Sequence, residues 1–242
     1  MENIQLNTIY NEDCLETMKR MPDGFVDLVL TDPPYGTTAC KWDTVIPYEP
    51  MWEQLRRVTK DNGAIVLFGS QPFTSSLVMS NPEMFRYEWI WVKSRPNGFL
   101  DANRKPMKKH EIISVFSKGR ATYIPQGLVL KAKPNKNSGK ENVYGKVKKD
   151  YKAEVTYTNY PNTILTYSSG NNKYHPTQKP VDLLEYLIKT YTKSGEIVLD
   201  FTCGSGSTLV AAQNLNRNYI GSEISKEYCD IAERRLAQEV LL

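Results

Sequence analysis

Asp32, Pro33, Pro34 and Tyr35 place a carboxylate, a backbone carbonyl and an aromatic ring within four consecutive residues. Each proline fixes its own φ and pushes the residue before it towards extended geometry, so the tetrad forms a stiff loop. A planar amine on a nucleobase could donate one hydrogen to the Asp32 carboxylate and one to the Pro33 carbonyl while Tyr35 stacks on the ring. The nitrogen lone pair would then point towards an electrophile. A bare Pro-Pro-Tyr is also typical of a turn or a short polyproline segment, so the surrounding elements decide between the two.

A second group of polar residues lies far along the chain, in a loop that contains two glycines. Asp200 follows an apolar run, Gly204 and Gly206 come next, and an acidic residue, Glu223, stands 19 positions after Gly204. A strand, a Gly-x-Gly loop, a helix and an acidic residue in this order form the βαβ nucleotide-binding arrangement, in which Glu223 suits ribose hydroxyls. Asp200 would repel a pyrophosphate but would pair with the ammonium group of S-adenosylmethionine. The loop residues predicted to bind this cofactor are Asp200, Phe201, Cys203, Gly204, Ser205, Gly206, Ser207 and Thr208.

Both loops follow apolar runs that predict buried strands, and ligands bind at the carboxyl ends of strands in open α/β sheets. We take the strand before Asp200 as the first of the sheet and the strand before Glu223 as the second. The natural third strand then ends before Asp13 and the fourth before Asp32. This circularly permuted order places Asp13 and Cys14 beside the adenine of the cofactor and Asp32 next to its transferable methyl. Asp13 serves equally well as a helix cap.

The other apolar patterns alternate between strands and helices. They predict strands near residues 7–10, 64–68, 87–92, 111–116 and 219–223, and helices near 14–21, 51–58, 71–79, 181–190, 209–215 and after 225. This alternation predicts an α/β fold with a doubly wound, mostly parallel, Rossmann-like sheet. Residues 118–172 depart from it with weak periodicity, so we expect an inserted, partly mobile unit there. The predicted organisation is a catalytic part at 1–117, the insert at 118–172 and a cofactor-binding part of the same domain at 173–242.

The formal net charge of +4 conceals a strongly basic region. Residues 93–152 contain sixteen Lys and Arg against four acidic residues, so this region carries +12 and the rest of the chain −8. A solvated lysine-rich face is one explanation, yet so much charge of one sign beside a catalytic loop more often indicates a polyanion as partner. The basic residues predicted to contact DNA are Arg95, Arg104, Lys105, Lys108, Lys109, Lys146, Lys148 and Lys149.

Composition disfavours several other classes of protein. The four cysteines form no Cys-x-x-Cys pair and the chain has only two histidines, so we expect no metal site and reduced thiols. No cysteine has the context of a nucleophile that attacks a pyrimidine ring, which disfavours cytosine C5 chemistry. No apolar run reaches 18 residues and the N-terminus lacks the pattern of a signal peptide, so we expect a soluble, cytoplasmic protein without membrane contact.

Together the motifs resemble the amino-methylating DNA methyltransferases, in the permuted (beta-class) order that has the catalytic motif before the cofactor motif. The resemblance covers nearly the whole chain. It rests on four motifs: Asp32-Pro33-Pro34-Tyr35, His110-Glu111-Ile112, His175-Pro176-Thr177-Gln178-Lys179-Pro180 and Asp200-Phe201-x-x-Gly204-Ser205-Gly206-Ser207-Thr208. The family usually has a proline or alanine where this chain has Thr202 and Cys203, a departure that leaves the glycines in place.

The resemblance implies a site-specific DNA methyltransferase that uses S-adenosylmethionine and flips its target base out of the duplex. Residues 118–172 would then be the target-recognition region, and Lys179 and Asp32 would join the cofactor-binding residues. An aspartate at the first catalytic position usually goes with adenine. The predicted acceptor is therefore adenine N6, held by Asp32, Pro33 and Tyr35 without a covalent enzyme intermediate.

Three alternatives stay open at the level of the sequence. Cytosine N4 methylation is the nearest, since its amine satisfies the same loop. A DNA-binding protein that keeps the fold without the activity is disfavoured by the intact loops at Asp32 and Asp200, and a nicotinamide-dependent oxidoreductase by Asp200 and the basic region. A homodimer and a cognate restriction enzyme are kept as candidate partners beside DNA.

Overall fold

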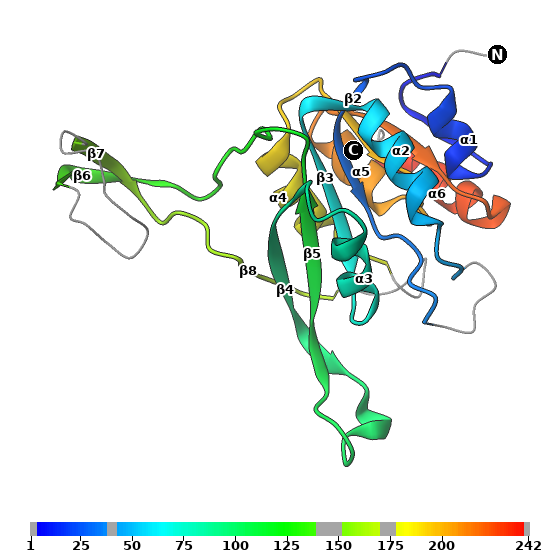
Figure 1. Ribbon diagram of the computed structural model, residues 1–242, viewed down its shortest axis with the longest axis horizontal. Helices are drawn as coiled ribbons and strands as arrows, with labels where there is room; N and C mark the ends of the chain where they lie inside the picture. Colours follow the sequence, from blue (N-terminus) through cyan, green and yellow to red (C-terminus); the bar gives the residue numbers. More distant parts are fainter. Residues whose placement is uncertain (1–3, 38–42, 139–151, 170–177, 240–242) are drawn as a thin grey trace. The chain divides into compact units, whose positions relative to one another are not determined.

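The computed structural model describes residues 4–37, 43–138, 152–169 and 178–239. The chain divides into two compact units, one formed by residues 1–124 and 163–242 and a smaller one formed by residues 125–162. The larger unit contains an eight-stranded sheet with helices on both faces (Figure 1). The smaller unit contains an antiparallel pair of strands, β6 (Val129–Ser138) and β7 (Lys152–Thr158).

The large sheet has the strand order β1-β10-β9-β2-β3-β5-β4-β8. Its strands are β1 (Thr8–Tyr10), β2 (Val26–Thr31), β3 (Thr59–Gly69), β4 (Phe85–Asn97), β5 (Lys108–Phe116), β8 (Ile164–Tyr167), β9 (Ile197–Asp200) and β10 (Asn218–Ser222). The strands from β1 to β3 are parallel, whereas β5 is antiparallel to both β3 and β4. The strand that ends at Asp200 therefore lies between the strands that lead to Glu223 and Asp32, as the sequence predicts.

Helices cover both faces of this sheet because alternate residues of its central strands point to opposite sides. Leu28 and Leu30 of β2 pack with α4 (Val181–Tyr191) and α5 (Ser207–Asn214). Val29, between them, packs on the other face with α1 (Cys14–Lys19), α2 (Tyr48–Val58) and α3 (Phe73–Ser80). The last helix, α6 (Lys226–Glu239), contacts α5 and β1. The predicted doubly wound, mostly parallel α/β fold is confirmed.

The strands at the far edge of the sheet differ from the prediction. β4 and β5 continue past the end of β3 as a two-stranded hairpin whose tip carries the short 3-10 helix η1 (Phe99–Asp101) (Figure 1). The sequence predicts this strand only to residue 92, because the residues after it are polar. In the structure the strand continues because its backbone forms hydrogen bonds with the partner strand, which a local pattern does not reveal. β8 pairs with β4 at the sheet edge although the sequence analysis assigns it to the insert. β8 has only four residues, of which only Leu165 is buried. A strand this short does not show the alternation of apolar and polar residues that would identify it in the sequence.

The smaller unit spans 125–162, which is less than the predicted insert at 118–172. The middle of that insert, residues 139–151, lies outside the described residues. No helix in the described part of the chain is both long enough and apolar enough to cross a membrane.

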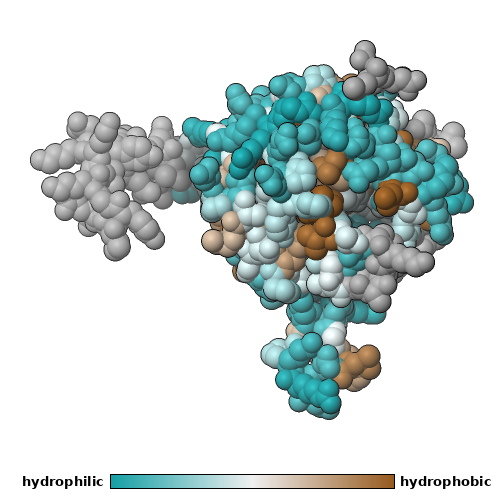
Figure 2. Space-filling model, turned by 45° about the vertical axis from the view of Figure 1, so that its right-hand side comes forward, coloured by the Kyte–Doolittle hydropathy of each residue, from teal (hydrophilic) through white to brown (hydrophobic). Residues whose placement is uncertain are grey.

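The surface of the hairpin tip is mixed in character. Figure 2 shows hydrophilic residues over most of the tip, with one hydrophobic group beside them. The most exposed apolar side chains of this tip are Phe99 and Leu100 of η1, at 80% and 100% exposure. Basic residues on both strands flank them, so the tip combines positive charge with an aromatic ring.

Candidate active site

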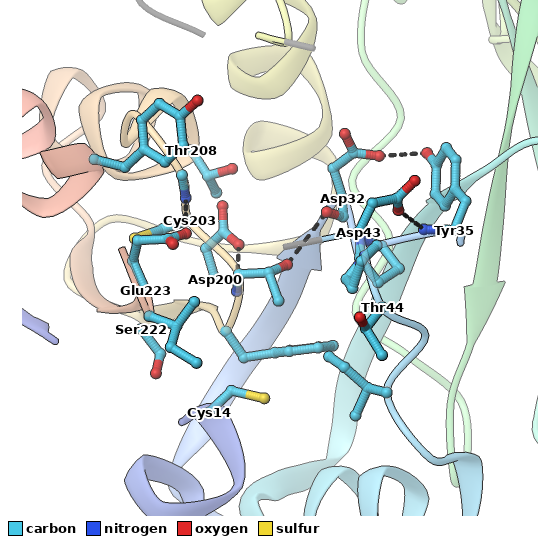
Figure 3. A pocket seen from close by; sticks show the side chains of 18 of the residues that line it. Cys14, Asp32, Tyr35, Asp43, Thr44, Asp200, Cys203, Thr208, Ser222 and Glu223 are labelled. Atoms are coloured by element: carbon cyan, nitrogen blue, oxygen red, sulfur yellow. Dashed lines mark hydrogen bonds between the residues drawn. The ribbon is translucent and has the colours of Figure 1, made fainter. Parts of the chain in front are cut away.

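A cavity of about 600 Å³ opens at the carboxyl ends of β1, β10, β9 and β2 (Figure 3). Parallel strands place their carboxyl ends at one edge of a sheet, so both predicted loops meet there. The predicted catalytic and cofactor-binding residues that line the cavity are Asp13, Cys14, Asp32, Pro33, Pro34, Tyr35, Lys179, Asp200, Phe201, Cys203, Gly204, Ser205, Ser207, Thr208 and Glu223. Gly206 is not among the lining residues and is the N-cap of α5. A cavity of this size is typical of cofactor pockets.

Asp32 stands one residue beyond β2, and both of its carboxylate oxygens accept hydrogen bonds. The Tyr35 hydroxyl donates to Oδ1 and the Lys179 ammonium donates to Oδ2. The ring of Tyr35 packs against that of Phe73 with the ring centroids 4.9 Å apart. Burial raises the pKa of the Asp32 carboxyl, and it raises the pKa of the Tyr35 phenol well above its ordinary value. The phenol therefore keeps its proton and serves as a donor beside Asp32 (Figure 3).

Asp43 holds the loop that follows the tetrad, a role that the sequence analysis did not predict. Its buried carboxylate accepts hydrogen bonds from the backbone N–H groups of Tyr35 (2.8 Å), Gly36 (2.9 Å) and Thr37 (2.9 Å). Three donors on one carboxylate keep this backbone in place. The contacts span six to eight positions, longer than a local Asx turn, so no short sequence pattern indicates them. Residues 38–42 lie outside the described residues.

Threonine side chains join the catalytic tetrad to the cofactor loop. Asp200 is buried at the end of β9, where its Oδ1 accepts from the Thr31 hydroxyl (2.5 Å) and from the Thr202 backbone N–H (3.2 Å). The Thr202 hydroxyl donates to the Asp32 carbonyl (3.2 Å). Burial raises the pKa of Asp200 to about 6. Threonine at position 202, where the resembling family usually has proline or alanine, therefore supplies a hydrogen bond between the two loops.

Glu223 and Asp13 follow β10 and β1 and line the same cavity. The Glu223 carboxylate accepts from the backbone N–H of Gly204 (3.0 Å) and of Ser225 (2.8 Å), and burial raises its pKa. Asp13 is the N-cap of α1, where its Oδ1 accepts from the Leu15 N–H (2.8 Å). The capping role is thus confirmed for Asp13, while its contact with a cofactor stays a prediction.

The cysteines of the described residues are buried free thiols. Burial raises the pKa of Cys14 to about 12 and that of Cys229 to about 11, and it raises the pKa of Cys203 well above its ordinary value. Since a protonated thiol is a poor nucleophile, Cys14 and Cys203 line the cavity as small side chains rather than as reactive groups. Cys40 lies outside the described residues.

The predicted DNA-binding residues fall into two groups. The first is exposed on the hairpin of β4 and β5 and consists of Arg95, Arg104, Lys105, Lys108 and Lys109. This hairpin begins at the end of the sheet where the cavity lies, because Ile112 of β5 pairs with Gly69 at the carboxyl end of β3. The second group, Lys146, Lys148 and Lys149, lies outside the described residues, so its contact with DNA stays a prediction.

Two further charged residues extend the contacts of Lys179 away from Asp32. Lys179 lies 3.4 Å from Oε2 of Glu111, and Lys93 lies 2.5 Å from Oε1 of the same carboxylate. The resemblance drew attention to Glu111 through its motif but gave it no role, and nothing in the sequence singled out Lys93. Ion pairs between residues so far apart in the chain follow only from the folded sheet.

Comparison with known proteins identifies the family. A family model described as N6_N4_Mtase, DNA methylase, matches residues 26–234. The Type II methyltransferase M.BglII of Bacillus subtilis is 31% identical over 97% of this chain and 70% of its own length. The putative methylase YubD of Escherichia coli is 28% identical over 93% of this chain and 88% of its own length.

Solved structures of methyltransferases have the same fold. M1.HpyAVI, solved as a complex with SAM, has a TM-score of 0.64 and 27% identity over 95% of this chain and 98% of its own. The cytosine-N4-specific PvuII DNA methyltransferase has a TM-score of 0.68 over 96% of this chain and 87% of its own, but its 17% identity shows a shared fold alone. Because the family model spans most of the sequence, this chain belongs to the N6_N4 family of DNA methylases, the amino-methyltransferases of DNA.

Proposed function

We propose that this chain transfers the methyl group of S-adenosylmethionine to the N6 amine of an adenine flipped out of DNA. The observation that carries the proposal is the shared cavity, which brings the Asp32 tetrad and the Asp200 loop together. The motif order, with the tetrad after β2 and the cofactor loop after β9, supports the permuted (beta-class) arrangement. Aspartate at the first position of the tetrad supports adenine rather than cytosine as the acceptor.

The cavity fits S-adenosylmethionine in its size and in the chemistry of its walls. The buried Asp200 carboxylate would pair with the ammonium group, and Glu223 with the ribose hydroxyls. Asp13 and Cys14 would lie at the adenine. When bound, the cofactor supplies an electrophilic methyl group on a sulfonium. The rest of the proposed binding loop consists of Phe201, Cys203, Gly204, Ser205, Ser207 and Thr208 along the wall, together with Gly206, the N-cap of α5.

The affinity for S-adenosylmethionine is expected to rise with pH through about 6 and to level off above. The pKa of Asp200 is about 6, and only the ionised carboxylate pairs with an ammonium. Below this pH, binding must release a proton from Asp200, so the affinity should fall by up to about tenfold per pH unit. Asp200→Asn should bind more weakly at neutral pH and lose the part of the slope that Asp200 contributes. Calorimetry over roughly pH 5 to 8 measures both proteins, and a flat wild-type profile would contradict the role of Asp200.

The acceptor amine is proposed to bind at Oδ1 of Asp32. In the structure the Tyr35 hydroxyl donates to this oxygen, so the arriving amine takes a position where the carboxylate already accepts a hydrogen. The Pro33 carbonyl would accept the second amine hydrogen while the Tyr35 ring stacks on the base. Asp32 would then stabilise the positive charge that develops on the amine, and it need not act as a strong base.

The experiment that tests this function identifies the methylated base. Purified protein is incubated with duplex DNA of mixed sequence and S-adenosylmethionine labelled in its methyl group, and the DNA is digested to nucleosides. N6-methyladenine supports the proposal, whereas N4-methylcytosine assigns the chain to the other acceptor of its family. DNA without label contradicts both assignments and favours a protein that binds DNA without modifying it.

Neutralising Lys146, Lys148 and Lys149 together is expected to weaken DNA binding uniformly across sequences. Each phosphate contact that is lost should reduce the steepness of log affinity against log salt by about 0.9. The loss of three contacts should therefore reduce it by roughly 2.7. Binding of labelled duplex at several salt concentrations measures this slope. The control changes three lysines that the structure shows to be exposed, Lys19, Lys189 and Lys193, to glutamine. Equal slopes in the two variants would place Lys146, Lys148 and Lys149 in solvent and move the proposed DNA path to the hairpin of β4 and β5.

The assignment of residues 118–172 to target recognition is part of the same proposal, since this span contains the three lysines and the smaller unit. Two protein partners also stay predictions. A second copy of the chain is tested by sedimentation of the protein with and without DNA, and a cognate restriction enzyme by the sensitivity of the methylated DNA to cleavage.

A further inference from the structure

Four buried charges of alternating sign lead away from the acceptor side of the cavity. Asp32 pairs with Lys179, Lys179 with Glu111, and Glu111 with Lys93. Their side chains are 22%, 8%, 14% and 12% exposed in that order, so all four lie largely out of water. We call this set the charge chain. It is electrically neutral as a whole, which is the condition under which buried ions are tolerated.

The topology of the sheet explains why these residues meet. Asp32 follows β2, whose neighbour β3 ends at Gly69 opposite Ile112 of β5. Glu111 precedes Ile112 and thus reaches the same edge of the sheet, with β4 and Lys93 on its other side. Lys179 comes from the segment before α4 and passes over the ring of Phe68 at 5.0 Å from the centroid.

The charge chain affects the ionisation of Asp32 in addition to burial. Burial raises the pKa of Asp32, the Lys179 cation opposes this rise, and the Glu111 carboxylate adds to it. Burial alone would also raise the pKa of Glu111, but the Lys179 and Lys93 cations bring it below its ordinary value. Lys179 stays protonated despite burial because two carboxylates face it. Tyr35 also faces Asp32, and its neutral hydroxyl adds a hydrogen bond but no charge.

We propose that Lys179 is a positioning residue for Asp32, which holds Oδ2 and keeps the carboxylate ionised so that Oδ1 is presented to the acceptor amine. Glu111 then limits how strongly Lys179 acts, because it shares the same ammonium. This inference rests on the proposed function of Asp32. It gives Lys179 a role on the acceptor side of the cavity, whereas its motif suggested contact with the cofactor.

The test compares single-turnover methylation by Lys179→Met and Glu111→Gln as a function of pH. Lys179→Met should lower the rate at neutral pH by about 100-fold, because the acceptor is no longer held in place. It should also move the acidic limb of the profile to higher pH, since a cation that favours the carboxylate is gone. Glu111→Gln should move the acidic limb to lower pH, since an anion that disfavours the carboxylate is gone. Shifts of opposite sign from two neighbouring residues are not expected from general loosening of the fold.

Two controls complete the design. Lys60→Met removes a lysine from an ion pair with Asp27, 2.7 Å long, at the amino ends of β2 and β3, and should leave the profile unchanged. Lys179→Arg keeps the cation and should recover most of the rate that Lys179→Met loses. Calorimetry with S-adenosylmethionine should give the same affinity for Lys179→Met as for the parent.

Other outcomes would overturn the inference in a recognisable way. If Lys179→Met binds S-adenosylmethionine much more weakly while its acidic limb stays in place, Lys179 holds the cofactor and not Asp32. If Lys179→Met does not fold, the position of the acidic limb in Glu111→Gln still decides, because an unmoved limb contradicts the charge chain. If the parent protein methylates no DNA, the proposed function itself is wrong, and this result is obtained before any variant is compared.

Discussion

Asp32→Asn is expected to abolish methyl transfer and to leave the binding of S-adenosylmethionine nearly unchanged. Asparagine keeps the volume of the side chain but removes the charge that stabilises a developing cation on the amine. The loss of one well-placed electrostatic contact of this kind lowers a rate by roughly a hundredfold to a thousandfold. The loss at Asp32 should reach at least the upper end of that range, because this carboxylate also positions the acceptor. Cofactor binding should persist because Asp200, at the end of β9, and Glu223, directly after β10, supply the proposed polar contacts.

The measurement is single-turnover methylation of labelled duplex DNA, with the cofactor affinity determined in parallel by calorimetry. Asp32→Ala is the less favourable variant for this purpose, since it removes the oxygen that accepts from Lys179 as well as the charge, whereas asparagine keeps an oxygen in the side chain. Removing one partner of a buried ion pair costs about 3–5 kcal/mol of stability, which would mix a folding defect with the catalytic one. Asp23→Asn, at an exposed side chain, serves as the control. Turnover close to that of the parent in Asp32→Asn would remove the central assignment of the active site.

Local sequence patterns predicted the two loops of the site because each loop follows a buried strand directly. Val26 to Thr31 are all buried, so the run that ends before Asp32 was recognisable as a central strand. The strand that ends at Asp200 is buried from Val198 onward and was recognisable in the same way. A general rule about the carboxyl ends of parallel strands then placed both loops at one edge. The order β1-β10-β9-β2 follows from these positions without any knowledge of side-chain contacts.

Contacts that depend on distant parts of the chain could not be predicted in this way. Lys179 and Asp32 are separated by 147 positions, and their ion pair exists only because α4 packs against the sheet beside β2. The contacts of Asp43 were missed for a different reason, since its carboxylate accepts from backbone N–H groups six to eight positions earlier, and no short sequence pattern indicates such contacts. Polar residues of the hairpin and the short strand β8 were missed because their hydrogen bonds come from partner strands rather than from their own sequence.

The region that would give sequence specificity illustrates the same limit. Composition identified residues 118–172 as unusual, and the structure separates residues 125–162 as a compact unit. Within it, β6 and β7 pair in antiparallel register with a shift between Leu130 and Asn135. Charge indicates a partner but not a base sequence, because contacts to phosphates carry affinity without readout. The recognition sequence therefore has to come from mapping the methylated sites.

Gly206→Ala is expected to destabilise the protein by about 2–5 kcal/mol and to weaken cofactor binding. Gly206 has a φ of +78°, and a Cβ there would lie 2.7 Å from the Cβ of Ala232 in α6. The left-handed conformation costs an alanine about 1–2 kcal/mol, and the overpacking against α6 adds about 1–3 kcal/mol. Because Gly206 is the N-cap of α5 and stands between Ser205 and Ser207 of the cavity wall, any shift that relieves the contact also moves the loop that is proposed to hold the cofactor.

Gly195→Ala separates these two contributions to the loss of stability. Gly195 has a φ of +83°, but a Cβ at this position would meet no atom of the described residues within 4 Å. This variant should therefore lose only the conformational part, about 1–2 kcal/mol, and bind the cofactor normally. Urea unfolding gives the free energy of unfolding of each variant, and calorimetry gives the affinity. The double variant Gly206→Ala/Ala232→Gly should recover the stability that the steric contact costs. The glycine that it places within α6 should itself cost about 1 kcal/mol. Equal losses in Gly206→Ala and Gly195→Ala would mean that α6 moves aside freely, and that the close packing of Gly206 on α6 does not hold the cofactor loop in place.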